Sequence, residues 1–269
     1  MTPTASLPMY NLPEMRAVNA RFWEALRGLL VEAGLRDIPQ SLTFDRLPVP
    51  ERIGSEVLFS QTCGYPLETI FLGQAVQLGT PCYAVPGCDG PTHCGVFVVP
   101  AGSPAEELRD LRGGIFLFNN RHSNSGMNLP RRALADIADG HPFFAKVIET
   151  GSHPGNLDRI ARGEADGTAV DNVTYAFWCH YRPGAAREVR VLAPTPPSPA
   201  IPFVTSVATP PATVQILRTV LRILVHDARY QAVRTGLLLS DIVDLPDTAY
   251  RRLLDYEREA GELGYPALA

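Results

Sequence analysis

The sequence predicts an α/β protein, and three observations support this. Short apolar strands alternate with helical segments along the chain. The pattern contains no internal repeat and no low-complexity tract. The chain has 269 residues, of which 45% are hydrophobic, so it can form a sizeable core. Strands joined by helices usually pair in parallel, so we expect parallel sheets covered on both faces, with ligands at the carboxyl ends of the strands.

The first half of the chain carries clear start and stop signals for its helices. The predicted elements are strands at 6–10, 57–60, 95–99 and 115–118, and helices at 13–33, 67–71 and 127–139. Pro13 and Glu14 suit the first turn of a helix, where no N–H is lost and the dipole favours a carboxylate. Ser103, followed by Pro104 and Glu106, predicts a capping box and a further helix start. Pro130 is tolerated only in a first turn, so its helix must begin near residue 127.

The second half continues the alternation. Its predicted elements are strands at 144–148, 168–170, 189–192 and 204–207, and helices at 156–161, 172–179, 214–225 and 249–260. The proline-rich run at 194–202 predicts an extended connector. The helix at 214–225 is strongly amphipathic, because its apolar residues recur at helical spacing.

Composition excludes two classes of protein. The formal net charge of -4 argues against a general nucleic-acid binder, which would carry an excess of basic residues. No stretch approaches the roughly 18 unbroken apolar residues that a membrane-spanning helix needs. Lys146 is the only lysine, and the replacement of lysine by arginine elsewhere indicates the codon bias of a GC-rich genome.

The start of the chain and its cysteines bear on the compartment. The first nine residues contain no Lys or Arg and two prolines, so they do not form a secretory signal. The chain is then either cytosolic or exported with a leader already removed. The five cysteines lack the spacing of a zinc site, and we expect neither metal nor cofactor. Disulfides joining Cys88 to Cys63 or to Cys94 and free thiols are both compatible with the sequence.

Four strand-to-helix junctions are polar and rich in hydroxyl groups. They lie at 60–64, 123–126, 151–153 and 171–172. A helix start offers free N–H groups and a positive dipole end, which bind an anion without lysine. Ser123 and Ser125 add hydroxyl donors, and Gly126 allows close approach of the backbone. We therefore predict a binding site for a small oxyanion, although each of these residues is also an ordinary helix cap.

Other polar and aromatic residues near the same strand ends have two interpretations. His153 can donate to an anion, or it can be a solvated neighbour of a helix cap. Asp171 can accept from a ligand hydroxyl or amine, or it can cap the next helix. Tyr10, Tyr65, Tyr175 and Trp178 either line a pocket or belong to the core.

Enzyme signatures are scarce. The sequence has no dinucleotide-binding glycine motif, no phosphate loop of the Walker type and no nucleophile elbow. Cys63 at a helix start could act as a nucleophile, but no partner is identifiable. We therefore expect a binding protein and no enzyme.

Several runs of residues resemble a known family. They are Ser6-Leu7-Pro8-Met9-Tyr10, Leu58-Phe59-Ser60-Gln61-Thr62-Cys63-Gly64-Tyr65-Pro66-Leu67, Gly87-Cys88, Asn124-Ser125-Gly126, Thr150-Gly151-Ser152-His153 and Gly264-Tyr265-Pro266. In this order they resemble the phosphate, phosphite and phosphonate substrate-binding proteins of ABC transporters. The run at 60–67 is the most specific of them, and the resemblance extends over essentially the whole chain.

The resemblance implies a fold and a set of binding residues. The fold is that of type II periplasmic binding proteins, with two α/β lobes and a ligand cleft between them. One lobe would comprise residues 1–95 plus 195–269 and the other 96–194, with hinge crossings near 95–103 and 192–202. The implied ligand-binding residues are Ser123, Asn124, Ser125, Gly126, His153 and Asp171, with Tyr10, Gln61 and Tyr65 from the first lobe.

The function that the resemblance implies is capture of a small oxyanion, namely phosphate, phosphite or a phosphonate, by lobe closure. The partner would be an ABC permease, and the compartment would be the periplasm. The alternatives are a cytosolic enzyme that acts on a pyrimidine or thiamine precursor through His153 and a cysteine, or a ligand sensor on the same fold. Neither alternative involves nucleic acid.

Overall fold

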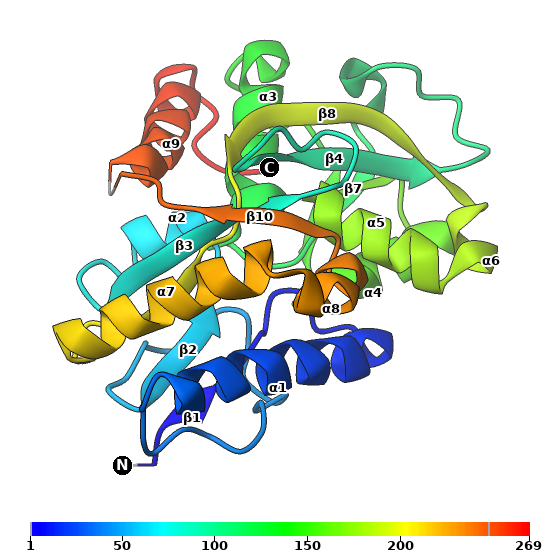
Figure 1. The fold of residues 1–269 in the computed structure, drawn as a ribbon. Coiled ribbons are helices and arrows are strands. Elements are labelled where there is room, and N and C mark those ends of the chain that lie inside the picture. The colour runs from blue at the N-terminus through cyan, green and yellow to red at the C-terminus, as the bar shows by residue number, and fades with distance from the viewer. Residues whose placement is uncertain (1, 247) are drawn as a thin grey trace. The chain divides into compact units, whose positions relative to one another are not determined.

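The computed structural model describes residues 2–246 and 248–269, which form two compact α/β units (Figure 1). The first unit comprises Met1–Ala84, Cys88–Thr92 and Pro199–Ala249. The second comprises Val85–Gly87, His93–Ser198 and Tyr250–Ala269. Both units are therefore discontinuous in sequence, and each has its own five-stranded sheet.

The sheet of the first unit is mixed. Its order is β1 (Thr4–Ala5), β2 (Val57–Gln61), β9 (Phe203–Ser206), β3 (Ala75–Tyr83) and β10 (Leu239–Val243). Only β1 and β2 pair in parallel, and the other three pairs are antiparallel. The expectation of an all-parallel sheet is thus wrong here, because β9 runs opposite to both of its neighbours.

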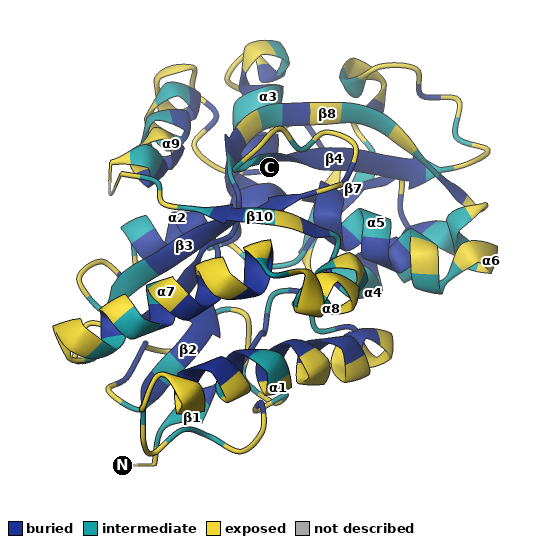
Figure 2. Cartoon of the chain, viewed as in Figure 1, coloured by how far each residue is buried: buried dark blue, intermediate teal, exposed yellow. Residues whose placement is uncertain are grey.

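Helices of the first unit bury one face each. They are α1 (Arg16–Glu32), α2 (Gly64–Glu68), α7 (Pro211–His226) and α8 (Gln231–Gly236), with short 3-10 segments at Pro13–Met15 and Ala228–Tyr230. The outer faces of α1 and α7 are exposed (Figure 2). Phe22 of α1 stacks on Phe203 with ring centroids 5.8 Å apart, and Phe203 stacks on Phe59 at 5.3 Å. These aromatic side chains fix the helix on the sheet, since stacked rings add to the burial of apolar surface.

The sheet of the second unit has a parallel half. Its order is β6 (Lys146–Glu149), β5 (Ile115–Phe118), β7 (Gly167–Asp171), β4 (Thr92–Pro100) and β8 (Val189–Pro199). Strands β6, β5 and β7 are parallel, whereas β4 is antiparallel to β7. The carboxyl ends of β5 and β7 therefore lie at the same edge of the sheet, next to the polar junctions that follow them.

The helices of the second unit cover a core rich in phenylalanine. They are α3 (Leu129–Ala138), α4 (His153–Ala161), α5 (Asn172–Tyr181), α6 (Pro183–Ala186) and α9 (Arg252–Glu262), with 3-10 segments η2 (Leu108–Leu111) and η5 (Ala249–Arg251) and a π-helix, η3 (Asn124–Asn128). Phe116 stacks on Phe144 with centroids 4.5 Å apart. Ala260, Tyr265 and Leu268 complete this core from the C-terminal segment.

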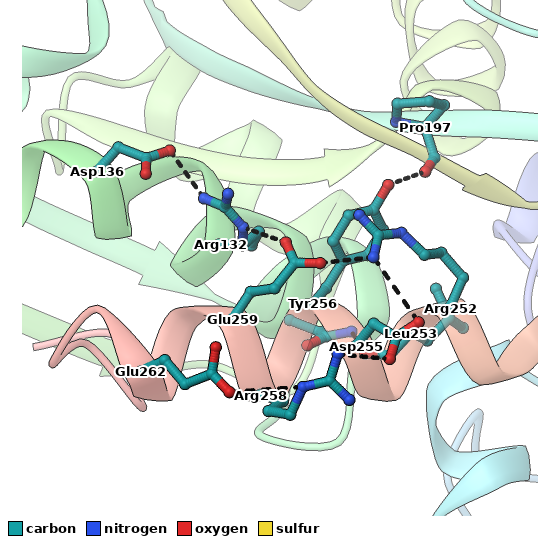
Figure 3. Close-up of polar contacts among 11 residues, drawn as sticks. Arg132, Asp136, Pro197, Arg252, Leu253, Asp255, Tyr256, Arg258, Glu259 and Glu262 are labelled. Carbon is teal, nitrogen blue, oxygen red and sulfur yellow. Dashed lines mark hydrogen bonds and ion pairs between the residues drawn. The ribbon is translucent and has the colours of Figure 1, made fainter.

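The C-terminal segment is held to the second unit by polar contacts as well (Figure 3). Glu259 accepts from Arg132 of α3 at 2.8 Å and from Arg252 at 2.5 Å. The Tyr256 hydroxyl donates to the carbonyl of Pro197 at 2.9 Å. The predicted division placed residues 195–269 in one lobe, whereas Tyr250–Ala269 packs with the second unit here. The predicted hinge crossings stay predictions.

Three local expectations differ from the structure. Residues 6–10 are not a strand, because pairing with β2 ends at Ala5. Ser103 starts no helix, since the reciprocal capping box forms instead between Glu107 and Asp110 at η2. The proline-rich run at 194–202 was predicted to be an extended connector, but most of it belongs to strand β8. In addition, strands β3 and β10 and helix α8 were not predicted. Within residues 2–246 and 248–269, no helix has the length and apolar character needed to cross a membrane.

Candidate functional site

The turn that begins η3 is built around Ser123. The residue has an extended backbone, and its hydroxyl oxygen accepts from the N–H of Gly126 at 3.0 Å. Its carbonyl accepts from the N–H groups of Met127 and Asn128 at 3.2 and 3.1 Å. The sequence predicts free N–H groups at this helix start, but those of Gly126 and Met127 are already hydrogen-bonded within the turn. The hydroxyl groups are the donors that remain, because a serine that accepts one bond still carries its own hydrogen.

His153 brings the two hydroxyl groups together. It is the first residue of α4, and Ser152 caps that helix by accepting from the N–H of Gly155 at 3.1 Å. The Nε2 atom of His153 lies 3.2 Å from Oγ of Ser125 and 3.5 Å from Oγ of Ser123. Two serines from one turn and an imidazole from the next helix thus converge at one point.

Position 126 has no room for a side chain and therefore requires glycine. A Cβ atom at this position would lie 2.0 Å from Oδ1 of Asn119 and 3.1 Å from Cε1 of His153. Among the described residues, Oδ1 of Asn119 and Nδ1 of His153 are buried without a well-aligned hydrogen-bond partner. Buried polar atoms are usually paired in folded proteins, so the unpaired Oδ1 atom of Asn119 beside a turn of hydroxyl groups marks this place as a candidate ligand site.

Asp171 lies at the end of β7, where it both caps a helix and faces the same region. Its Oδ1 atom accepts from the N–H of Thr174 in α5 at 2.7 Å, and the residue is only 2% exposed. Asp171 is paired in register with Gly95 of β4. A Cβ atom on Gly95 would lie 3.5 Å from the carbonyl oxygen of Ser125, so this strand pair lies directly against the turn of η3.

His93 is a site residue that the sequence did not identify. It precedes Gly95 by two residues in β4, so the two positions share the face on which Asp171 lies. His93 is 2% exposed, and its Nδ1 atom is buried without a hydrogen-bond partner in the described part of the chain. The sequence does show that His93 and Gly95 are two residues apart on one strand and therefore share a face. It does not show which strand pairs with them, so it could not place His93 beside Asp171.

Burial keeps both imidazoles neutral. It lowers the pKa of His93 and of His153 below the ordinary value, and the Asp171 carboxylate opposes this shift in each case. The backbone carbonyl of Ala169 also opposes it at His153. Burial raises the pKa of the neighbouring Cys94 thiol, and the Asp171 charge adds to that effect. The two imidazole rings of the cluster are therefore neutral near pH 7.

Asn124 lies in the turn but faces inward. Its Nδ2 atom donates to Oγ of Ser198 at 3.0 Å, and its Oδ1 atom accepts from Asn128 at 3.1 Å. Asn128 also donates to the carbonyl of Leu253 at 2.9 Å, and accepts from Arg131 at 2.8 Å. This buried network fixes the backbone of η3 and connects it to the C-terminal segment.

The first unit brings together two of its three predicted residues. Tyr10 and Gln61 line one small pocket together with Tyr83, which was not predicted. Gln61 donates to the Tyr83 hydroxyl at 3.1 Å, and the rings of Tyr10 and Tyr83 meet edge to face with centroids 5.5 Å apart. Tyr65 is buried separately in α2.

Trp178 and Cys63, two other candidates from the sequence, lie outside this cluster of hydroxyl groups and imidazoles. Trp178 is fully buried and donates to Asp158 at 2.9 Å. All five cysteines are free thiols, and Cys63 is the cap residue of α2. In the part of the chain that is described, no three His, Cys, Asp or Glu side chains are placed to hold a metal ion.

Residues 75–250 match the family model described as "ABC transporter, phosphonate, periplasmic substrate-binding protein". The chain belongs to this family. The description of this family is that of a substrate-binding component of ABC transporters. No curated protein matches the chain by sequence.

Several solved structures share the fold of this chain. A phosphonate ABC transporter binding protein from Pseudomonas aeruginosa is 14% identical with a TM-score of 0.76, covering 98% of this chain and 88% of that one. A Xanthomonas citri protein bound to ATP is 20% identical with a TM-score of 0.69, covering 98% of each. PhnD1 from Prochlorococcus marinus, in complex with methylphosphonate, is 13% identical with a TM-score of 0.71, covering 97% and 98%. The phosphonate-family chain thus has the predicted fold of type II periplasmic binding proteins.

Proposed function

We propose that this protein captures a small oxyanion that carries a phosphoryl or phosphonyl group and delivers it to an ABC permease. The observation that carries the proposal is the convergence of the Ser123 and Ser125 hydroxyl groups on Nε2 of His153. Hydroxyl and imidazole groups donate to oxyanion oxygens without adding net charge, which permits both binding and release. Gly126 allows the ring and the turn to approach closely enough to act on one ligand.

The ligands of two structural relatives support the ligand class. The Prochlorococcus marinus protein holds methylphosphonate and the Xanthomonas citri protein holds ATP. Both ligands carry phosphorus bonded to several oxygens, although they differ greatly in size. In our proposal the second unit binds the phosphorus group, while Tyr10 and Gln61 of the first unit contact the rest of the ligand after lobe closure; Tyr65, which the resemblance also implied, is buried apart from them. The compartment in this proposal is the periplasm.

Calorimetric titration of the whole chain with phosphate, phosphite, methylphosphonate and ATP tests the proposal. At least one of the four is expected to bind. Ser125→Ala removes one of the two converging hydroxyl groups and is expected to weaken binding about tenfold to a hundredfold, since a hydrogen bond to a charged group contributes roughly 1.5–3 kcal/mol. Ser240→Ala is the control, because that hydroxyl only donates to the carbonyl of Cys82 in the first unit. Failure of all four ligands to bind would refute the proposal.

A further inference from the structure

Ser198 is a buried serine that contacts the turn of η3, and the sequence did not indicate it as a site residue. It lies near the end of β8 and is only 3% exposed. Its Oγ atom accepts a hydrogen bond from Nδ2 of Asn124 at 3.0 Å. Asn124 lies between Ser123 and Ser125 in the sequence. The bond therefore acts on the residue that joins the two hydroxyl groups of the candidate site.

The side chain of Asn124 is held at both of its polar atoms. Its Oδ1 atom accepts from Nδ2 of Asn128 at 3.1 Å, while its Nδ2 atom donates to Ser198. An amide held in this way has one orientation, because turning it would break both bonds. The backbone on either side of Asn124 is thereby fixed. The two hydroxyl groups that converge on His153 are carried by that backbone, so their positions depend on the amide.

The segment that carries Ser198 is stiff. Four of the six residues at 194–199 are proline, which has a fixed φ angle and no N–H group. The other two residues bond to elements next to the turn. Thr195 accepts from the N–H of Gly95 in β4 at 2.8 Å, and Ser198 accepts from Asn124. A stiff segment that is anchored at two points holds the Ser198 hydroxyl in a fixed place.

We propose that Ser198 is a positioning residue for oxyanion binding, because through Asn124 it holds the two hydroxyl groups of the turn in the arrangement that receives the ligand. Ser198 does not contact the ligand in this proposal. The chain leaves the second unit directly after Ser198, since Pro199 belongs to the first unit. The binding turn is therefore tied to a point where the chain passes between the units. This inference rests on the proposed function and adds a residue through which a movement of that connection alters binding.

Ser198→Ala removes the acceptor of the bond and leaves the proposed ligand contacts in place. Calorimetry with methylphosphonate and with phosphate is expected to show an affinity about fivefold lower, the effect of one hydrogen bond between neutral groups. Stopped-flow measurements are expected to show that the dissociation rate constant rises by the same factor while the association rate constant stays unchanged, because a loosened turn releases the ligand sooner. Ser103→Ala is the matched control in the same unit, where the hydroxyl oxygen accepts from the N–H of Ala105 at 3.3 Å. It is expected to change neither rate constant.

A double-mutant cycle with Asn124→Ala tests whether the effect passes through the amide. Asn124→Ala removes the donor of the same bond and is expected to weaken binding at least as much as Ser198→Ala. In the Asn124→Ala background, Ser198→Ala is expected to weaken binding by about twofold at most. Thermal unfolding without ligand shows that each variant is folded at the temperature of the titration.

Two results would overturn the inference while leaving oxyanion binding intact. One is an unchanged affinity in Ser198→Ala together with a lower melting temperature, which would assign Ser198 a role in folding alone. The other is a pair of effects that multiply in the double variant, which would mean that Ser198 does not act through Asn124. If the unaltered protein binds neither of these probes and neither phosphite nor ATP, the proposed function is refuted together with the inference.

Discussion

The Nε2 atom of His153 lies 3.2 Å from the hydroxyl oxygen of Ser125, although 28 residues separate the two in sequence. The contact joins the first residue of α4 to the π-helix that follows β5. Strands β5 and β6 are parallel neighbours, so the segments that follow them emerge at the same edge of the sheet. The contact is therefore a consequence of sheet topology. The position of the imidazole ring also depends on the absence of a side chain at Gly126 in the turn.

Gly126→Ala is expected to move His153 away from the serines. The added methyl group would overlap Oδ1 of Asn119, at 2.0 Å, and press on the imidazole at 3.1 Å. We expect at least a tenfold loss of affinity for the oxyanion and a loss of about 1–3 kcal/mol in the free energy of unfolding, as for other overpacked sites. Titration calorimetry and urea denaturation measure the two quantities.

Gly102→Ala is the matched control for this change. No atom lies within 4 Å of a Cβ placed at Gly102, and its backbone is not left-handed. It belongs to the same unit, so a general effect of removing a glycine from that unit would appear in both variants. Unchanged affinity in Gly126→Ala would show that the close approach of His153 to the turn has no role in binding.

Much of the site was predictable from the sequence because its residues follow strands directly. The segment from Ile115 to Gly126 reads as a strand followed by small polar residues, and the structure contains β5 and η3 there. The π-helical form of η3 was not predictable, since it depends on the inward-facing amides of Asn124 and Asn128. Those bonds reach residues 74 and 125 positions away along the chain.

The errors have a common physical cause. Strands β3 and β10 pair with each other in antiparallel register, yet 156 or more residues separate their partners. The period of apolar residues shows that a segment can be a strand and does not show its neighbour, so the direction of pairing was assumed. His93 was missed for the same reason, because only the pairing of β4 with β7 places it beside Asp171.

The stability of the ligand-free protein is expected to fall as the pH drops below about 6.5. Burial lowers the pKa of His93 and His153 from that ordinary value in the folded state. The unfolded chain then binds more protons than the folded one in this range, so stability present above pH 6.5 is lost as the pH falls toward the folded-state pKa values. Thermal unfolding at a series of pH values measures this loss.

Replacing His153 by Gln is expected to flatten the pH dependence, since one of the two titrating groups is gone. His141→Gln is the control, because that histidine is exposed. A variant at position 153 that keeps the full slope between pH 6.5 and 5 would contradict the assignment of the effect to the buried rings.

Asn128→Ala is expected to loosen both the binding turn and the C-terminal segment. The Asn128 side chain is fully buried and bonds Asn124, Arg131 and the carbonyl of Leu253. Its removal leaves the Leu253 carbonyl and the Arg131 guanidinium with one partner fewer, so we expect a loss of about 2–3 kcal/mol in the free energy of unfolding.

Hydrogen exchange in Asn128→Ala is expected to rise at residues 124–128 and 252–262 together, because the one amide bonds both segments. Arg258→Ala removes only exposed ion pairs on α9 and is expected to leave exchange at 124–128 unchanged. Faster exchange in α9 alone for Asn128→Ala would mean that the turn is held by its own backbone bonds and not by the link to the C-terminal segment.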